Sequence, residues 1–236
     1  MRRGLELGLR IIDTSELYGA GHTDELVKIA AAEIYNVYVV YKIQPPAAAP
    51  EEVTKRAVIA AERLGRRPWI LMFHWTPVHV HICDVVKALE TAVAKGLAEH
   101  YGLSNVTYKQ LTAAMTCFKK IAPAAVENRY SLRYRRDELD VLPLTQREGM
   151  LYLAYSPLER GLLALDPYLA SIGARYNKTA AQVALNWYLA IPNLVPIVKS
   201  GSVKHVEENA GALGWALGEK DWKEIDKRFY SYRLEI

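Results

Sequence analysis

Four ionisable side chains in the first third of the sequence have types and positions that suit chemistry at a carbonyl group. Asp13 ends an apolar run and Tyr18 follows it closely, while Lys42 and His74 end the next two apolar runs. A lysine ammonium beside a tyrosine lowers a phenol pKa that is about 10 in water, and a carboxylate keeps that lysine protonated. A histidine that bonds a substrate oxygen polarises a carbonyl. Together these groups suit proton donation to a carbonyl oxygen while a hydride reaches its carbon, and a hydride carrier is required because no side chain supplies one.

Each of the four residues also has an ordinary structural interpretation. Asp13 and Tyr18 are typical turn or core-edge residues at the end of a strand. Lys42 suits a solvent-facing position, and a lone histidine such as His74 is more often a core-edge residue than a ligand. Convergence favours chemistry, because ionisable groups at equivalent ends of consecutive parallel strands meet in space.

The elements that must position these groups are strand-like apolar runs that alternate with helix-like patterns. Residues 53–64 and 85–93 have helical spacing and end before Gly65 and Gly96. Such repeats predict an α/β fold with a parallel sheet covered on both faces. Seven units outnumber a typical open sheet, and no Gly-x-Gly-x-x-Gly follows a strand, so we predict a TIM-type (β/α)8 barrel rather than a doubly wound sheet. The expected strands are residues 10–14, 38–43, 69–74, 100–103, 124–127, 151–156 and 194–198.

Composition favours one globular domain over residues 1–236. Of these residues 51% are hydrophobic and 24% are charged, which supplies a large core. The Pro/Ala-rich segment 44–50 is too short for a linker and predicts a loop that ends where a helix begins at Pro50. The net charge of +4 comes from interleaved charges, so we expect no nucleic acid partner, and the apolar stretch of a signal peptide or membrane span is lacking.

The chain contains two cysteines, Cys83 and Cys117, at isolated positions. Their spacing does not match a metal site, and we expect each to be a small buried hydrophobic residue in a reducing compartment. The sequence therefore predicts a cytoplasmic protein without a bound metal.

Several segments resemble motifs of the aldo-keto reductase family. Residues 12–19 resemble its "DTAxxYG" signature, and residues 39–42 resemble the strand that carries the family lysine. The resemblance covers nearly the whole chain in the right order. The further segments are residues 74–77, similar to "HWP" with one insertion, 95–105, similar to "GKIRxIGVSN", 154–158, similar to "AYSPL", 181–187, similar to "AQVALRW", and 196–200, similar to "IPKS".

This resemblance implies a (β/α)8 barrel that reduces aldehydes or ketones with NADPH. It places Asp13, Tyr18, Lys42 and His74 in the catalytic tetrad, with Tyr18 as the proton donor. It also implies cofactor contacts at further positions. These are Ser104 and Asn105 at the nicotinamide carboxamide, Tyr155 stacked on its ring, Ser156 and Leu158 in a pyrophosphate-contacting loop, Lys199, Ser200 and Ser202 at the 2′-phosphate, and Glu208 and Asn209 at the adenine.

Three positions depart from the family pattern, and we expect the replacement of a small hydroxyl residue by Tyr41, just before the lysine, to matter least. Glu127 stands where the family usually has a glutamine that touches the carboxamide, so a possible negative charge replaces an amide donor. His205 stands where an arginine commonly clamps the 2′-phosphate, although Lys204 lies beside it. We therefore expect NADPH as the cofactor and keep NADH as a possibility.

A further departure is the missing first strand of the family barrel. The "DTAxxYG" strand begins about ten residues after Met1, so we expect about seven of eight strands and exposed edges at residues 10–14 and 194–198. We expect a start codon upstream. The short loop after Leu158 and the short tail predict a shallow, open substrate pocket.

Functions from other classes stay open at this point. A cofactor-binding regulatory subunit with slow turnover, like the potassium-channel β subunits of the same superfamily, would keep the cofactor residues. An inactive truncated reductase would bind neither cofactor. As a partner we expect a small carbonyl substrate, and we expect a monomer or weak oligomer.

Overall fold

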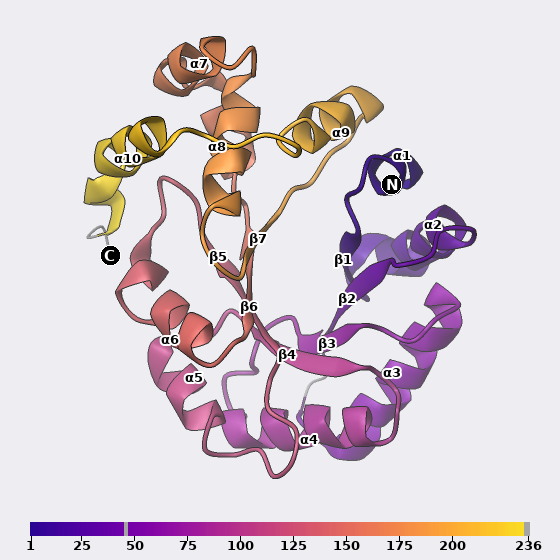
Figure 1. Ribbon diagram of the computed structural model, residues 1–236. Coiled ribbons are helices and arrows are strands. Elements are labelled where there is room, and N and C mark those ends of the chain that lie inside the picture. The colour runs from indigo at the N-terminus through magenta and orange to yellow at the C-terminus, as the bar shows by residue number, and fades with distance from the viewer. Residues whose placement is uncertain (45–46, 234–236) are drawn as a thin grey trace. The chain divides into compact units, whose positions relative to one another are not determined.

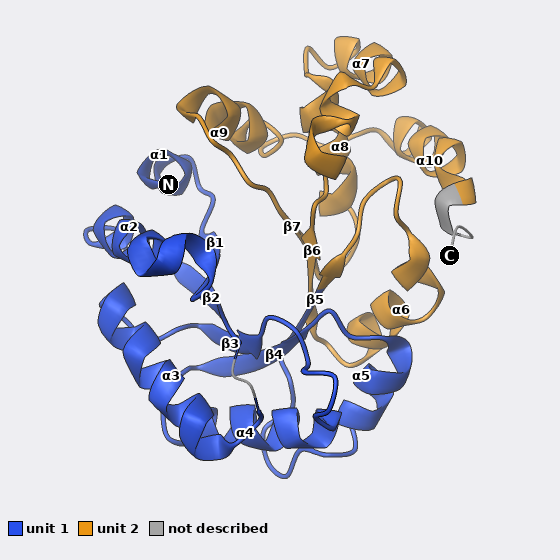
Figure 2. Ribbon diagram, turned by 180° about the vertical axis from the view of Figure 1, so that it is seen from behind, with its two compact units in different colours: residues 1–127 blue, residues 128–236 orange. Residues whose placement is uncertain are grey.

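The computed structural model describes residues 1–44 and 47–233. The chain divides into two compact units, residues 1–127 and residues 128–236, which Figure 2 shows in blue and orange. One domain over the whole chain stays a prediction. Residues 45 and 46 of the predicted loop at 44–50, and the last three residues of the tail, lie outside the described part.

The strands of unit 1 pair side by side in chain order, and every pairing is parallel. In register, Ser15 lies beside Lys42 and Ser104 lies beside Glu127. Because the strands are parallel, their carboxyl ends share one edge, and side chains at those ends come together. The strands are β1 (Ile11–Ser15), β2 (Tyr38–Ile43), β3 (Ile70–Phe73), β4 (His100–Ser104) and β5 (Ala125–Arg129), whose first three residues belong to this unit.

Helices connect the strands of unit 1, and α2, α3 and α4 lie along one face of β1 to β4 (Figure 1). Helix α3 begins with a proline in its first turn, where the missing N–H costs nothing, and ends at Gly65 with φ 65°. Helix α5 begins with a capping box between Thr107 and Gln110. The helical segments are α1 (Arg2–Glu6), η1 (Tyr18–Gly21), α2 (His22–Ala31), α3 (Pro50–Leu64), α4 (Ile82–Ala94) and α5 (Tyr108–Ala114).

The core of unit 1 lies between these helices and the sheet. Val86 of α4 is fully buried, and so are the first three residues of β3, while the fourth, Phe73, is 2% exposed. Burial of each such side chain contributes roughly 1.5–3 kcal/mol. Gly102 of β4 leaves room for its neighbours, because a Cβ there would lie 2.8 Å from Met72 Cε and 2.9 Å from the Ala125 carbonyl oxygen.

Unit 2 contains two further strands, which pair in parallel with Tyr155 beside Ile197. Its core includes the stacked indoles of Trp187 and Trp222, with ring centroids 5.2 Å apart. The buried Arg135 guanidinium lies over Trp187 and binds Glu138 at 2.6 Å. The elements are η2 (Arg136–Leu139), α6 (Val141–Arg147), β6 (Leu151–Tyr155), η3 (Glu159–Gly161), η4 (Leu163–Leu165), α7 (Pro167–Ala174), α8 (Ala180–Leu189), β7 (Leu194–Ile197), α9 (Val203–Ala210), α10 (Glu219–Arg228) and η5 (Tyr230–Arg233).

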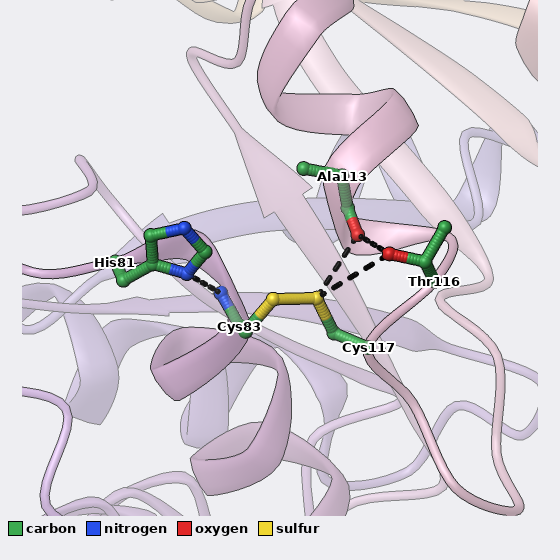
Figure 3. Close-up of a disulfide and its surroundings, with 5 residues drawn as sticks. All are labelled: His81, Cys83, Ala113, Thr116 and Cys117. Carbon is green, nitrogen blue, oxygen red and sulfur yellow. Dashed lines mark hydrogen bonds between the residues drawn. A yellow bond between two sulfur atoms is a disulfide. The ribbon is translucent and has the colours of Figure 1, made fainter.

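The two cysteines form a disulfide, so the prediction of two isolated, buried thiols was wrong. Figure 3 shows Cys83, at the start of α4, and Cys117, after α5, with their side chains pointing toward each other. Their Cα atoms are 5.2 Å apart, and both residues are partly exposed. A separation of 34 residues hid this pairing, because helix packing alone brings the two positions together. The expectation of a reducing compartment therefore loses the support of free thiols.

All seven predicted strands are present, each within two residues of its expected bounds. The backbone edge predicted to be exposed at residues 10–14 belongs to β1. Among the described strands of unit 1, β1 pairs with β2 along one of its edges. Among residues 1–44 and 47–233, no helix has both the length and the apolar character needed to cross a bilayer.

Candidate functional site

The carboxyl ends of the strands in unit 1 bring Lys42 into contact with two carboxylates. Lys42 Nζ donates to both carboxylate oxygens of Asp13, each at 2.5 Å, and to Glu127 Oε1 at 2.9 Å. The side chains of Lys42, Asp13 and Glu127 are 1%, 9% and 4% exposed, so the three charges lie largely out of contact with water. The carboxylates raise the pKa of Lys42 well above its ordinary value against the opposing effect of burial, and Lys42 is a cation at every physiological pH.

Tyr18 lies at the mouth of this cluster, in the loop after β1. Its ring centroid is 5.7 Å from Lys42 Nζ, and its side chain is 38% exposed. The pKa of the Tyr18 phenol is raised, because burial outweighs the lowering effect of Lys42 and the two carboxylates add to the rise. Lys42 lowers this pKa as expected, but burial and the two carboxylates outweigh it, so the pKa of the phenol does not move toward neutrality.

His74, which follows β3, forms the other side of the opening. Its ring meets the Tyr18 ring edge-on with centroids 5.6 Å apart, and it stacks on Trp75 at 6.0 Å. Its Nδ1 lies 3.1 Å from the hydroxyl oxygen of Ser15, a buried residue of β1. Burial and the Lys42 charge lower the pKa of His74, although Asp13 opposes them, so the imidazole is neutral at pH 7.

The next strand ends in Ser104 and Asn105, which lie against the same cluster. Asn105 Nδ2 donates to the His74 carbonyl at 2.9 Å and to Ser104 Oγ at 3.0 Å. The Asn105 backbone N–H donates to the Glu127 carbonyl at 2.9 Å. Asn105 has φ 55°, a left-handed conformation that asparagine adopts more readily than most residues. The chain therefore turns sharply at the end of β4 and keeps both side chains at the strand ends.

Glu127 is deeply buried, and its surroundings raise the pKa of its carboxyl group. Burial and the nearby Asp13 charge raise its pKa to about 8, against the lowering effect of Lys42. Its Oε2 is buried and has no hydrogen-bond donor among the described residues. The sequence predicted a departure at this position but missed the ion pair with Lys42, because the contact joins residues 85 positions apart.

Ser15 is a second residue that sequence reasoning missed. Its Oγ accepts a hydrogen bond from the Leu17 backbone N–H at 3.2 Å and lies against His74. The signal was present in the strand pattern, because Asp13 and Ser15 lie two positions apart on one strand and so face the same side of it.

The remaining predicted residues lie in unit 2, at the ends of its two strands. Tyr155 ends β6, and Ser156 follows it with φ 57°. Within the short loop after β6, Glu159 and Arg160 also have positive φ values of 47° and 55°. Left-handed backbone at three residues other than glycine stores strain of about 1–3 kcal/mol each, and such strain clusters at ligand sites. Leu158 closes the turn by accepting from the Gly161 N–H at 2.9 Å.

The segment after β7 presents hydroxyls and cations around the start of α9. Ser202 caps the helix, with its Oγ accepting from the His205 N–H at 3.3 Å. Asn209 Nδ2 donates to Ser200 Oγ at 2.9 Å. The side chains of Lys199 and His205 are exposed, whereas Ser200, Glu208 and Asn209 are partly buried. Within unit 2 the structure therefore joins Ser200 to Asn209 and Ser202 to the first turn of α9.

A separate cavity of about 390 Å³ lies in unit 1 at the opposite ends of the strands from Lys42. It is lined by Tyr38 at the start of β2, Trp69 just before β3 and Glu99 just before β4, together with Arg66 and Arg67. None of the predicted site residues lines it.

Comparison with known proteins identifies the class. The sequence profile of the Aldo/keto reductase family matches residues 1–228, and the chain belongs to that family of oxidoreductases. The chain is 29% identical over 236 residues to methylglyoxal reductase YeaE of Escherichia coli strain K12, covering 97% of this chain and 83% of that protein. It is also 29% identical over 249 residues to pyridoxine 4-dehydrogenase of the same organism, covering 96% of this chain and 84% of that protein.

Solved structures give the same result for the fold. The crystal structure of the thermostable aldo-keto reductase Tm1743 with the inhibitor epalrestat matches with a TM-score of 0.88 and 29% identity, over 96% of this chain and 84% of that one. An aldo/keto reductase from Klebsiella pneumoniae, solved with NADP and acetate, matches with a TM-score of 0.87 and 27% identity, over 97% and 83%. The prediction of a (β/α) barrel fold is confirmed, with seven strands among the described residues.

Proposed function

We propose that this chain reduces an aldehyde or ketone with NADPH, and that Tyr18 donates the proton to the carbonyl oxygen. The observation that carries the proposal is the convergence of Tyr18, Lys42, Asp13 and His74 at the strand ends of unit 1. A phenol that keeps its proton at neutral pH is in the right state to act as a general acid. Lys42 provides a fixed positive charge beside the oxygen from which the proton leaves.

The contact between Ser15 and Nδ1 of His74 supports an assignment of the nitrogen that faces the substrate. The Ser15 oxygen already accepts from the Leu17 N–H, so its own O–H is available to donate to Nδ1 of His74. In a neutral imidazole an accepting Nδ1 leaves the proton on Nε2. His74 then offers Nε2–H to the substrate oxygen and orients it beside the Tyr18 phenol.

The residues predicted to hold NADPH fit such a ligand in each unit. When bound, NADPH supplies the hydride. In unit 2 the start of the eight-residue helix α9, the exposed Lys199 and Lys204, and the hydroxyls of Ser200 and Ser202 suit a phosphate dianion. His205 stands in this group in place of an arginine, so NADH stays an alternative cofactor. In unit 1 we assign Ser104, Asn105 and Glu127 to the nicotinamide end of the cofactor.

The test is Tyr18→Phe, assayed by the loss of NADPH absorbance with methylglyoxal and with an aromatic aldehyde. General acids contribute typically 10²–10⁴-fold, so we expect kcat to fall by at least about 100-fold while NADPH binding, followed by fluorescence, is retained. Tyr35→Phe is the matched control, because Tyr35 is 90% exposed on the surface of the same unit. Unchanged turnover by Tyr18→Phe would refute the assignment of the proton donor.

A second candidate is a cofactor-binding regulatory subunit with little turnover. The observation that favours it is the pairing of Lys42 with two carboxylates, which weakens its effect on Tyr18 and raises the pKa of the phenol. Tight NADPH binding without oxidation of any carbonyl compound would support this second candidate.

A further inference from the structure

Glu127 lies beside the catalytic lysine without matching any of the four predicted catalytic positions. Its Oε1 accepts from Lys42 Nζ at 2.9 Å, on the nitrogen that also donates to both oxygens of Asp13. All three side chains are at least nine-tenths buried. The cluster is therefore a lysine held between two carboxyl groups with little access to water.

The charges of this cluster do not balance if both carboxyl groups are ionised. One ammonium and two carboxylates give a net charge of −1, and burial strongly disfavours an uncompensated charge. The buried Oε2 of Glu127 would then be an anionic oxygen without a hydrogen-bond donor among residues 1–44 and 47–233. The carboxyl groups of Glu127 and Asp13 both accept from the same ammonium, so they compete for one cation, and a proton on one of them restores neutrality.

We propose that Glu127 is a positioning residue that holds a proton and thereby keeps the cluster that faces Tyr18 neutral rather than net negative. The proton belongs on Glu127 rather than on Asp13, because Asp13 accepts two hydrogen bonds from Lys42 and Glu127 accepts one. Two carboxyls that compete for one site separate into one that is ionised and one that is neutral.

Loss of this proton changes the field at the phenol. Within unit 1 the titratable groups that face Glu127 are Asp13 from β1, Lys42 from β2 and Tyr18 from η1, with His74 beyond Tyr18. Of these Lys42 alone is a cation at neutral pH. When Glu127 releases its proton to solvent, the cluster becomes net negative, the phenol binds its own proton more tightly, and proton donation to a carbonyl slows.

The direct test detects the proton without any reaction. Infrared spectra of the protein labelled with ¹³C at the glutamate carboxyl are compared at pH 6 and pH 10, so that the aspartates, including the buried Asp24 and Asp137, do not contribute to the isotope shift. We expect a labelled carboxylic acid C=O band at pH 6 that disappears at pH 10 and is missing from Glu127→Gln. No labelled acid band at pH 6, or an unchanged band in Glu127→Gln, would overturn the proposal.

A kinetic test rests on the proposed reductase function and is read separately. Because burial and the Asp13 charge raise the pKa of Glu127, wild-type kcat should fall as the pH increases through that pKa. In Glu127→Gln the fall in kcat should move to higher pH. Glu33→Gln, which removes an exposed charge of the same unit, is the control and should keep the wild-type profile. If kcat falls over the same pH range in Glu127→Gln as in wild type, the proposal for Glu127 is contradicted. If the wild type is inactive but shows the labelled acid band, only the proposed reductase function is refuted.

Discussion

Replacement of Lys42 by methionine should destabilise unit 1 strongly, because it leaves two buried carboxyl groups without their shared cation. Methionine is about as long as the lysine stem and fills the same space, so the change isolates the charge. The ammonium donates three hydrogen bonds at 2.5–2.9 Å to Asp13 and Glu127, and all of them are lost. In the variant, the carboxyl groups of Asp13 and Glu127 lie near each other without a cation between them. If both stay ionised they repel each other, and uptake of a proton relieves that repulsion.

The size of the effect follows from these distances. At an effective dielectric constant near 20, an ion pair about 2.9 Å apart is attracted by about 6 kcal/mol, and desolvation of the charges offsets most of that gain. Removal of one partner from a buried pair costs about 3–5 kcal/mol, because an uncompensated buried charge is left behind. We expect the free energy of unfolding of Lys42→Met to fall by this amount at pH 8.

The loss should depend on pH in a defined direction. Burial already raises the pKa of Glu127, and loss of the ammonium, which lowers that pKa, raises it further, so the folded variant binds a proton that the unfolded chain has released. A raised folded-state pKa gives stability that is lost as pH increases from the unfolded value through the folded one. The destabilisation should therefore be smaller near pH 5 than at pH 8.

Urea denaturation followed by fluorescence measures these differences. Lys95→Met is the matched control, because Lys95 is exposed and, among the contacts that the structure describes, its Nζ touches only the Thr54 hydroxyl at 3.3 Å. This control should change the free energy of unfolding by no more than about 0.5 kcal/mol. The double variant Lys42→Met with Glu127→Gln should regain part of the loss. A loss below about 1 kcal/mol for Lys42→Met, equal at both pH values, would refute the description of a buried charged cluster.

Two further changes test packing and the disulfide. Replacement of both Cys83 and Cys117 by serine removes a cross-link between residues 34 positions apart, and in the chain-entropy account it should lower the free energy of unfolding by about 3–4 kcal/mol, measured in urea. A reducing agent should lower the stability of the wild type by the same amount. An unchanged urea midpoint in both experiments would contradict the disulfide. Gly102→Ala should cost about 1–3 kcal/mol, because its Cβ would lie 2.8 Å from Met72 Cε. Gly201→Ala, with open space around it, should have little effect, and equal thermal midpoints for the two glycine variants would argue against the tight contact at β4.

Much of the fold was predictable because its repeating pattern is local. Each strand of unit 1 is a short apolar run, and α3 is bounded by Pro50 and Gly65, signals that lie within the helix's own sequence. The position of the site was predictable for a related reason. Ionisable residues at the ends of parallel strands converge whatever the details of packing, and Asp13 and Lys42 do so.

What the sequence did not predict depends on distances between residues far apart in the chain. The disulfide requires that two helices pack in one particular way, and no spacing rule connects Cys83 to Cys117. The same holds for Glu127, whose burial and contact with Lys42 were not predicted. The direction of the Tyr18 pKa was missed because it depends on the balance of three charges and burial together.

The sequence separations within the charged cluster have a consequence for how the protein acquires activity. Lys42 contacts residues 29 positions before it and 85 positions after it, and these partners lie on the first and the fifth strand of unit 1. Closing such long loops is slow, because chain entropy is lost before the contact forms. The cluster is therefore completed late during refolding, after helices and neighbouring strands are in place. Enzymatic competence should return more slowly than secondary structure when the denatured chain refolds.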